Sequence, residues 1–192
     1  MVATVTIVRH TGASSATGTG SGQPGGALVT KIDGTTDRAS TSDTQSPGTA
    51  NPIPVPADAS TNYSFWVATK LSATAVAATA INNIKWYTDG TPSMGTGVAL
   101  NVATASNYIQ ATGTTGTTGN QLTSSFYNSS LNPSIAVNAF SKSSSAPISV
   151  NGSIGTVTGN ISDFVVYQVA VLSTAGPGVT PAEVLTWTYD QT

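Results

Sequence analysis

The sequence predicts an all-β fold, an antiparallel β-sandwich for which a jelly roll is one candidate arrangement, in a single domain over residues 1–192. Three observations predict this class. Short runs rich in β-branched and aromatic residues alternate between apolar and polar positions. Gly, Pro and Asp-Gly turn signals separate these runs. Convincing amphipathic helices are missing. The one helix-like stretch, the Ala-rich residues 72–80, lacks a charged face and fits a loop equally well.

Six strands are expected in the first part of the chain: 2–8, 27–32, 63–71, 81–88, 97–103 and 107–112. The first strand places Ala3, Val5 and Ile7 on one face and Thr on the other. The second and the fourth strand end at Asp33-Gly34 and Asp89-Gly90. Asp before Gly is typical of turns, so we assign these two carboxylates to turn geometry.

Five further strands are expected in the rest of the chain: 135–140, 148–151, 155–158, 164–172 and 183–190. The strand at 164–172 is apolar on both faces apart from Gln168, so it should be central and covered on each side. In the last strand, Leu185, Trp187 and Tyr189 share one face.

Two stretches, 11–26 and 34–61, are too long and irregular for ordinary connections and are interpreted as long loops or arms. The second contains the segment NPIPVP at 51–56, which favours extended or polyproline II backbone. The triplet repeat GTTGTTG at 113–119 is expected at the tip of a loop.

Charged residues are unusually rare, at 14 of 192 or 7%, where about 25% is typical. Ser (24) and Thr (32) take their place, and the net charge is only −2. Soluble monomers normally rely on interspersed surface charge. The composition therefore indicates that much of the surface meets other protein, in an assembled structural role. The six cations are scattered singly, which argues against a nucleic-acid partner.

The residues that could carry catalysis are few. The chain has no cysteine and a single histidine, His10, which any Ser-His-Asp triad would have to use, and no GxSxG motif is present. We expect His10 to be an ordinary exposed or edge residue. We assign no catalytic, cofactor-binding or metal-binding residue, and we expect no enzyme activity and no cofactor.

Carboxylates occur at eight positions: Asp33, Asp37, Asp43, Asp58, Asp89, Asp163, Glu183 and Asp190. A glycosidase or lyase would need two of them facing each other across a sugar, and this alternative stays open. Asp33, Asp37 and Asp43 lie in one loop, where a weak calcium site is an open alternative, although the DxDxDG pattern is absent.

Each of the three tryptophans, Trp66, Trp86 and Trp187, lies in an expected strand beside another aromatic residue. We favour core packing for Trp187, and core packing or a subunit interface for Trp66 and Trp86. Aromatic platforms of a carbohydrate-binding module are the alternative.

No targeting or membrane-spanning segment is evident. The N-terminus has neither the basic nor the apolar region of a signal peptide. The longest apolar run, at 164–172, is far shorter than the roughly 20 residues that a membrane span needs. We expect no membrane partner.

Two motifs carry a resemblance to a known class. Ile81-Asn82-Asn83-Ile84-Lys85-Trp86-Tyr87-Thr88-Asp89-Gly90 and Thr186-Trp187-Thr188-Tyr189-Asp190, together with the Thr/Gly-rich loops, resemble virion structural proteins of tailed bacteriophages. The nearest comparison is with capsid decoration (cement) proteins and small head or tail fibre proteins. The resemblance implies a β-sandwich, a homo-oligomer such as a trimer, and no catalysis. It also implies that the major capsid protein or other virion proteins are partners, and that the chain is made in the host cytoplasm and resides in the virion.

Two further non-enzymatic interpretations remain open at this point. A carbohydrate-binding or adhesive module of a fibre would expose coplanar aromatic side chains on one sheet. The subunit of an extracellular filament would polymerise without a shell, by strand exchange or through an extended arm.

Overall fold

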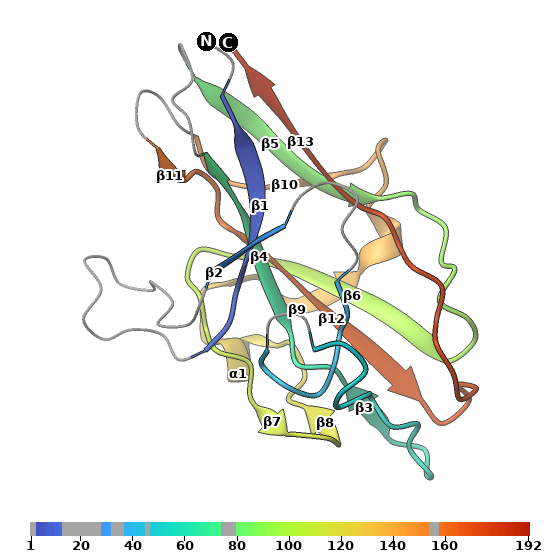
Figure 1. The fold of residues 1–192 in the computed structure, drawn as a ribbon. Coiled ribbons are helices and arrows are strands. Elements are labelled where there is room, and N and C mark those ends of the chain that lie inside the picture. The colour runs from blue at the N-terminus through green and yellow to red at the C-terminus, as the bar shows by residue number, and fades with distance from the viewer. Residues whose placement is uncertain (1–2, 13–27, 32–36, 45–46, 74–79, 154–157) are drawn as a thin grey trace.

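The chain folds almost entirely into antiparallel β-structure (Figure 1). The structure, a computed structural model, describes residues 3–12, 28–31, 37–44, 47–73, 80–153 and 158–192. Its elements are β1 (Val5–His10), β2 (Leu28–Lys31), β3 (Thr61–Tyr63), β4 (Val67–Ala73), β5 (Ile81–Thr88), β6 (Val98–Ala105), β7 (Gly113–Thr114), β8 (Thr118–Gly119), α1 (Ser124–Tyr127), β9 (Leu131–Asn138), the 3-10 helix η1 (Ala139–Ser141), β10 (Ile148–Ser149), β11 (Gly159–Asn160), β12 (Phe164–Leu172) and β13 (Leu185–Gln191). None of the helices in these segments has the length and apolar character needed to cross a membrane.

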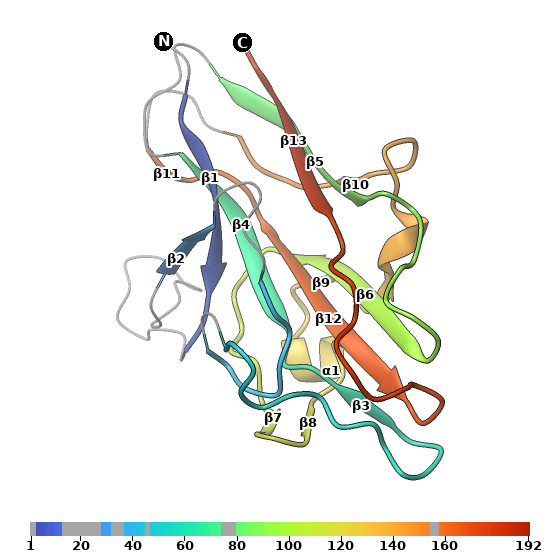
Figure 2. The same cartoon turned by 45° about the vertical axis from the view of Figure 1, so that its right-hand side comes forward.

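The main sheet has the strand order β2-β1-β4-β12-β6-β9, with β11 added beside β4 and β3 beside β12. A second sheet has the order β10-β5-β13. Figure 2 shows this three-stranded sheet layered against one part of the main sheet, with α1 and the β7–β8 hairpin toward the other end of the molecule. The expected antiparallel sandwich is confirmed, whereas this strand order does not establish a jelly roll.

Apolar side chains cover both faces of the main sheet. One core cluster lies between the two sheets and includes Trp86 of β5, Val102 of β6 and Val165 of β12, all fully buried. The other cluster lies on the opposite face, where residues 108–127 cover the sheet with side chains such as Tyr108 and Tyr127. Removing the apolar side chains of both faces from water is the main source of folding free energy for this sheet.

Strand β12 is central, as the sequence predicts. It pairs with β6 over eight residue pairs, from Phe164↔Ala105 to Val171↔Val98, and with β4 and β3 on its other side. Alternate residues of β12 enter the two clusters: Val165 and Val169 on one face, and Phe164 and Val166 on the other. A strand buried on both faces reads as a continuous apolar run, which explains the sequence pattern.

Several sequence-based expectations need correction. The strand predicted at 107–112 is irregular, because its backbone groups bond to side chains: Ile109 donates its N–H to the Tyr127 hydroxyl and accepts from Trp66 Nε1. The strand predicted at 63–71 is divided into β3 and β4. The helix-like stretch 72–80 begins as the end of β4, and residues 74–79 lie outside the described segments. The sequence did not predict α1 or η1.

Strand boundaries elsewhere are close to those expected. β5 and β12 begin and end at the predicted residues, while β1, β6 and β13 start and finish one to three positions later. The strand expected at 135–140 begins earlier, as β9, and the one at 148–151 is shorter, as β10. Most of the strand expected at 155–158 lies outside the described residues.

The long loop at 34–61 packs on its own domain wherever it is described. Ser40, Thr41 and Ser42 are buried, and the Ser40 carbonyl accepts the Phe65 N–H at 2.8 Å. Thr41 N–H donates to the Asn51 carbonyl at 2.8 Å, which closes the loop on itself. Residues 13–26 of the other predicted loop or arm lie outside the described segments. The repeat at 113–119, expected at the tip of a loop, forms the short β7–β8 hairpin.

Candidate functional site

The single histidine is buried at the end of β1, so the expectation of an exposed or edge position was wrong. His10 is 3% exposed, and β1 pairs with strands on both sides. Its ring lies edge-on to Phe164, with centroids 5.1 Å apart, and tilted against Tyr108 at 5.9 Å. These aromatic contacts explain the burial, because an uncharged imidazole packs as an apolar ring.

The electrostatic surroundings of His10 favour its neutral form. Burial lowers the pKa of His10 to about 4, and the nearby Lys70 lowers it further in the same direction. Among the described residues, neither imidazole nitrogen has a hydrogen-bond partner. A catalytic triad requires a carboxylate bonded to the histidine, and the described part of the chain supplies none there.

Lys70 lies beside this aromatic group and is only 8% exposed. Its Nζ is 4.1 Å from the centroid of the Phe164 ring, which is a cation–π contact. Burial lowers the pKa of Lys70 to about 8, and Asp163 partly opposes this shift. The sequence alone gave no sign of this arrangement, because Phe164 and Lys70 meet only through the pairing of β12 with β4.

The loop carboxylates that could have formed a calcium site have separate partners. Asp37 forms an ion pair with Arg9, at 2.9 Å from Nη1 to each carboxylate oxygen. Asp43 accepts hydrogen bonds from Gly12 N–H at 2.8 Å and Gln110 Nε2 at 2.9 Å. Asp33 lies outside the described residues. No group of three His, Cys, Asp or Glu side chains with metal-binding geometry occurs in the described segments.

The other carboxylates with a recorded hydrogen bond serve turns and loop contacts. Asp89 accepts the Thr91 N–H at 2.8 Å, and Gly90 has φ 83°, which confirms the predicted turn. Asp58 caps the Ser60 N–H at 3.0 Å. Glu183 accepts from both N–H and Oγ of Ser93, and Asp190 accepts from Asn83 Nδ2 at 2.8 Å. Each of these four carboxylates has a different hydrogen-bond partner, so none of these bonds brings two carboxylates to one group.

The tryptophans belong to the core. Trp86 is fully buried and Trp66 is 3% exposed, with its Nε1 bonded to the Ile109 carbonyl at 3.0 Å. Trp187 is half-buried and packs against the cluster between the sheets. Core packing is confirmed for Trp66 and Trp86, which therefore form no exposed sugar-binding platform, while Trp187 packs against the core with part of its side chain accessible.

The surface that offers binding capacity is the outer edge of β13. This strand pairs with β5 only, in the described part of the chain, from Leu185↔Thr88 to Gln191↔Ile81. We use the term β13 edge for its backbone over Leu185–Asp190 on the side away from β5. Unpaired N–H and C=O groups along a strand form a template for pairing with another strand.

The other sheet edges are shorter or better covered. At β9, Thr123 forms a bridge with Ile135, and Ala136 N–H donates to the Leu122 carbonyl at 3.3 Å. The outer strands β2 and β10 have only four and two residues. The β13 edge is also flanked by exposed apolar side chains, with Val184 68% and Tyr189 37% exposed. These features make it the best candidate contact surface of the described segments.

No protein-family model, no curated protein and no solved structure matches this chain.

Proposed function

We propose that the chain is a non-enzymatic structural protein that packs as a multimer on a viral shell and stabilises it, as a capsid decoration or cement protein does. The observation that carries this proposal is the scarcity of surface charge. Only six Lys and Arg are present, and two of them, Arg9 and Lys70, are buried. At most four cations remain to keep the surface hydrated, which favours a molecule whose surface is covered by other subunits.

Exposed apolar side chains support the same proposal. Val179 and Val184, in the segment between β12 and β13, are 84% and 68% exposed, and Leu172 at the end of β12 is 41% exposed. Phe126 on α1 and Ile135 on β9 are also exposed, at 51% and 60%, on two elements that contact each other. Apolar groups of this kind stabilise an interface when a partner covers them.

The assignment to a virion comes from the two motifs that resemble phage structural proteins. In the fold, the motif at Ile81–Gly90 is β5 with its turn, and the motif at Thr186–Asp190 is most of β13. These two strands pair with each other in the three-stranded sheet. The resemblance thus falls on one compact unit that also contains the candidate contact surface.

The mechanism we propose is mechanical. Subunits bind the assembled shell and not its separated parts, so binding stabilises the assembled state by mass action. Partners are other copies of this chain and the major capsid protein or another virion protein. The described residues give no catalytic group a role in this mechanism.

The test is the solution mass of the purified chain by light scattering, alone and after mixing with empty capsids of its source. A multimer that binds shells and raises their melting temperature supports the proposal. Long polymers without shells would indicate a filament subunit instead. A monomer that ignores shells would refute the proposal, and glycan binding would then be measured.

A further inference from the structure

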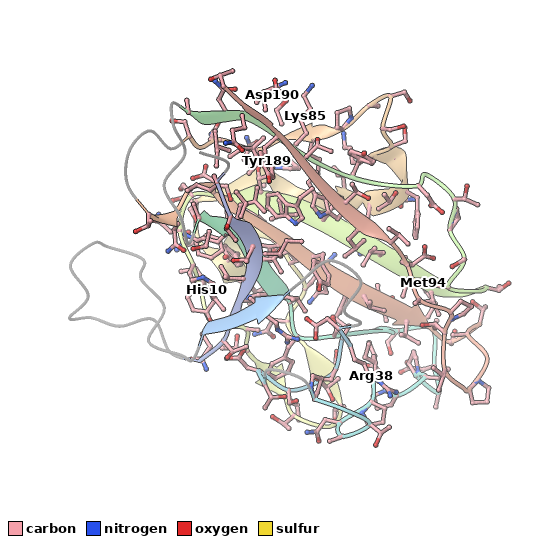
Figure 3. The ribbon with its side chains drawn as sticks, turned by 45° about the horizontal axis from the view of Figure 1, so that its top comes forward. His10, Arg38, Lys85, Met94, Tyr189 and Asp190 are labelled. Atoms are coloured by element: carbon pink, nitrogen blue, oxygen red, sulfur yellow. The ribbon has the colours of Figure 1, made fainter. Side chains whose placement is uncertain are left out.

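We propose that the β13 edge is where two copies of this chain join, through antiparallel pairing of β13 with the β13 of a second copy. This inference rests on the proposed function, because it names the contact within the multimer. Lys85, Tyr189 and Asp190 gather over β5 and β13 at one end of the molecule, away from the β7–β8 hairpin (Figures 1 and 3).

The hydrogen bonds around β5 establish which backbone groups face the free edge. Val150 N–H donates to the Ile84 carbonyl at 2.9 Å, and Thr88 N–H donates to the Lys142 carbonyl at 2.7 Å, so residues 84 and 88 direct their groups away from β13. Because backbone direction alternates along a strand, residues 85 and 87 bond to β13, opposite Thr188 and Thr186.

The hydrogen bonds at the end of β13 independently indicate the same orientation of its backbone groups. Thr192 and Ala80 exchange both backbone hydrogen bonds, at 2.9 and 3.0 Å. Even-numbered residues of this segment therefore bond inward to β5. The N–H and C=O groups of Leu185, Trp187 and Tyr189 point out along the β13 edge.

A second copy fits this edge because the edge is complementary to itself. In a twofold arrangement centred on Thr188, Trp187 of one copy pairs with Tyr189 of the other, and the reverse pair forms by symmetry. Each pair exchanges two backbone hydrogen bonds. The arrangement uses both free edges and closes, so it yields a pair of subunits and not a growing filament.

Side-chain charge is also complementary in this arrangement. Lys85 lies on β5 opposite Thr188, and Asp190 lies two residues further along β13. Antiparallel pairing centred on Thr188 places Asp190 of the second copy against Thr186. Its Cα is then about 12 Å from that of Lys85, by standard strand spacing and rise, a separation that only fully extended lysine and aspartate side chains span. A parallel arrangement would not place these opposite charges together across the twofold axis.

The strand also lacks the usual protection of an edge. Its seven residues, LTWTYDQ, contain no proline and no lysine. The one irregularity is a shift in register between Thr188 and Asp190, and the additional residue belongs to β5, where Asn83 has φ 50°. The bulge therefore leaves the outer side of β13 available.

The first test is disulfide cross-linking of single-cysteine variants, which is clean because the chain has no cysteine. In the proposed register Thr188 lies opposite Thr188 of the second copy, at a non-hydrogen-bonded position. The Cα atoms of such a pair lie about 4.5 Å apart, so two cysteines there can form a disulfide. We expect Thr188→Cys to give a covalent dimer on mild oxidation. The control Thr49→Cys should give no covalent dimer. Thr49 is exposed but is not part of β13; it lies in the loop closed by the hydrogen bond between Thr41 N–H and the Asn51 carbonyl.

The second test removes an outward N–H group. Tyr189→Pro deletes two of the four central hydrogen bonds of the pair and leaves the pairing with β5 intact, since proline is tolerated on an edge strand. The matched control, Tyr189→Thr, removes the same ring and keeps the N–H. We expect the dissociation constant of the pair to rise at least about tenfold in Tyr189→Pro relative to Tyr189→Thr.

The outcomes separate this inference from the proposed function. A multimer that binds shells, with no cross-link at Thr188 and an unchanged mass in Tyr189→Pro, would overturn the β13 contact and leave the proposed function intact. A Thr188→Cys cross-link that forms only to shell protein would overturn the second copy as occupant. A wild-type chain that is monomeric and does not bind shells would refute both.

Discussion

Gln168 shows how one polar residue can organise a buried site. It is 1% exposed on β12, and all of its hydrogen-bonding groups are used. Its Oε1 accepts the Leu122 N–H at 2.8 Å, and its Nε2 donates to the carbonyls of Ser64 and Asn120 at 2.7 and 2.8 Å. The side chain thereby connects the segment before β4 and the segment after β8 to the central strand.

Replacing Gln168 by leucine should be strongly destabilising. Gln168→Leu removes the side-chain partner of two buried backbone groups, Leu122 N–H and Ser64 C=O, and of the part-buried Asn120 C=O, and each loss costs about 1–3 kcal/mol. We expect the free energy of unfolding, measured by urea denaturation, to fall by at least about 3 kcal/mol. The control Gln121→Leu, at an exposed position, should change it by less than about 0.5 kcal/mol. Similar effects of the two substitutions would contradict the role assigned to Gln168.

The buried histidine should make stability depend on pH. The pKa of His10 is about 4 in the folded protein and near 6.5 in the unfolded chain, so the unfolded state binds more protons between these values. Stability is therefore fully present above pH 6.5 and is lost as the pH falls toward 4. Lys70 and Tyr108, which also face the ring, do not titrate in this range, because the pKa of Lys70 is about 8 and burial raises that of Tyr108.

We expect this contribution to be about 1–2 kcal/mol, less than the full pKa shift implies, since water screens part of the interaction. The measurement is the free energy of unfolding of the wild type and of His10→Phe at several pH values from 4 to 7. The wild type should lose stability toward pH 4 more steeply than the variant. Parallel curves would show that His10 does not titrate as described.

Among the structural elements, the junction between β5 and β6 depends on a glycine. Gly97 has φ 75°, and a Cβ there would approach Ala175 N at 2.5 Å. Its carbonyl accepts the Leu172 N–H at 2.8 Å, so this close approach joins the start of β6 to the end of β12.

Gly97→Ala should therefore destabilise the protein by about 2 kcal/mol or more, from backbone strain combined with a clash. Gly95→Ala is the matched control, because Gly95 has φ 93° and open space around its Cβ position. It should cost only about 1 kcal/mol. Thermal unfolding of the two variants measures the difference, and equal losses would show that the contact with Ala175 is unimportant.

The sequence predicted elements where side chains alone determine them. β12 was placed correctly because its run is apolar on both faces, which reflects its burial. β5 was placed correctly because the Asp89-Gly90 turn follows its last residue. Residues 107–112 gave the same kind of pattern but form irregular backbone, because Trp66 and Tyr127 satisfy the backbone groups of Ile109. Those partners are distant in sequence, so no local pattern reveals them.

The candidate contact surface was likewise predicted only in part from the sequence. The sequence identified β13 as a strand and placed Leu185, Trp187 and Tyr189 on one face. Leu185 and Trp187 pack against the cluster between the sheets, whereas Tyr189 is 37% exposed. Its position at the edge depends on strand order, which is set by long-range pairing and not by the strand's own residues. The burial of His10 was missed for the same reason, since Phe164 reaches it from β12 across β4.

For the whole molecule, the scarcity of charge predicts how association responds to salt. Contacts made by exposed charges weaken as ionic strength rises, whereas apolar contacts and backbone pairing do not. Because backbone pairing and apolar contact outweigh the two Lys85–Asp190 pairs of the proposed β13 contact, we expect the mass measured by light scattering to be unchanged or higher between about 0.05 and 0.5 M NaCl, where the Debye length falls severalfold. Dissociation at high salt would contradict an interface of weakly charged surfaces.

The central position of β12 also has a consequence for synthesis of the chain. β4 and β6 are made early, but in the main sheet they are joined only through β12, about 60–100 residues later in the sequence. Until residues 164–172 have left the ribosome, β4 and β6 each keep an open edge on the side where β12 pairs. The main sheet can therefore close only after β12 has emerged, and until then the open edges of β4 and β6 are available for pairing with other chains.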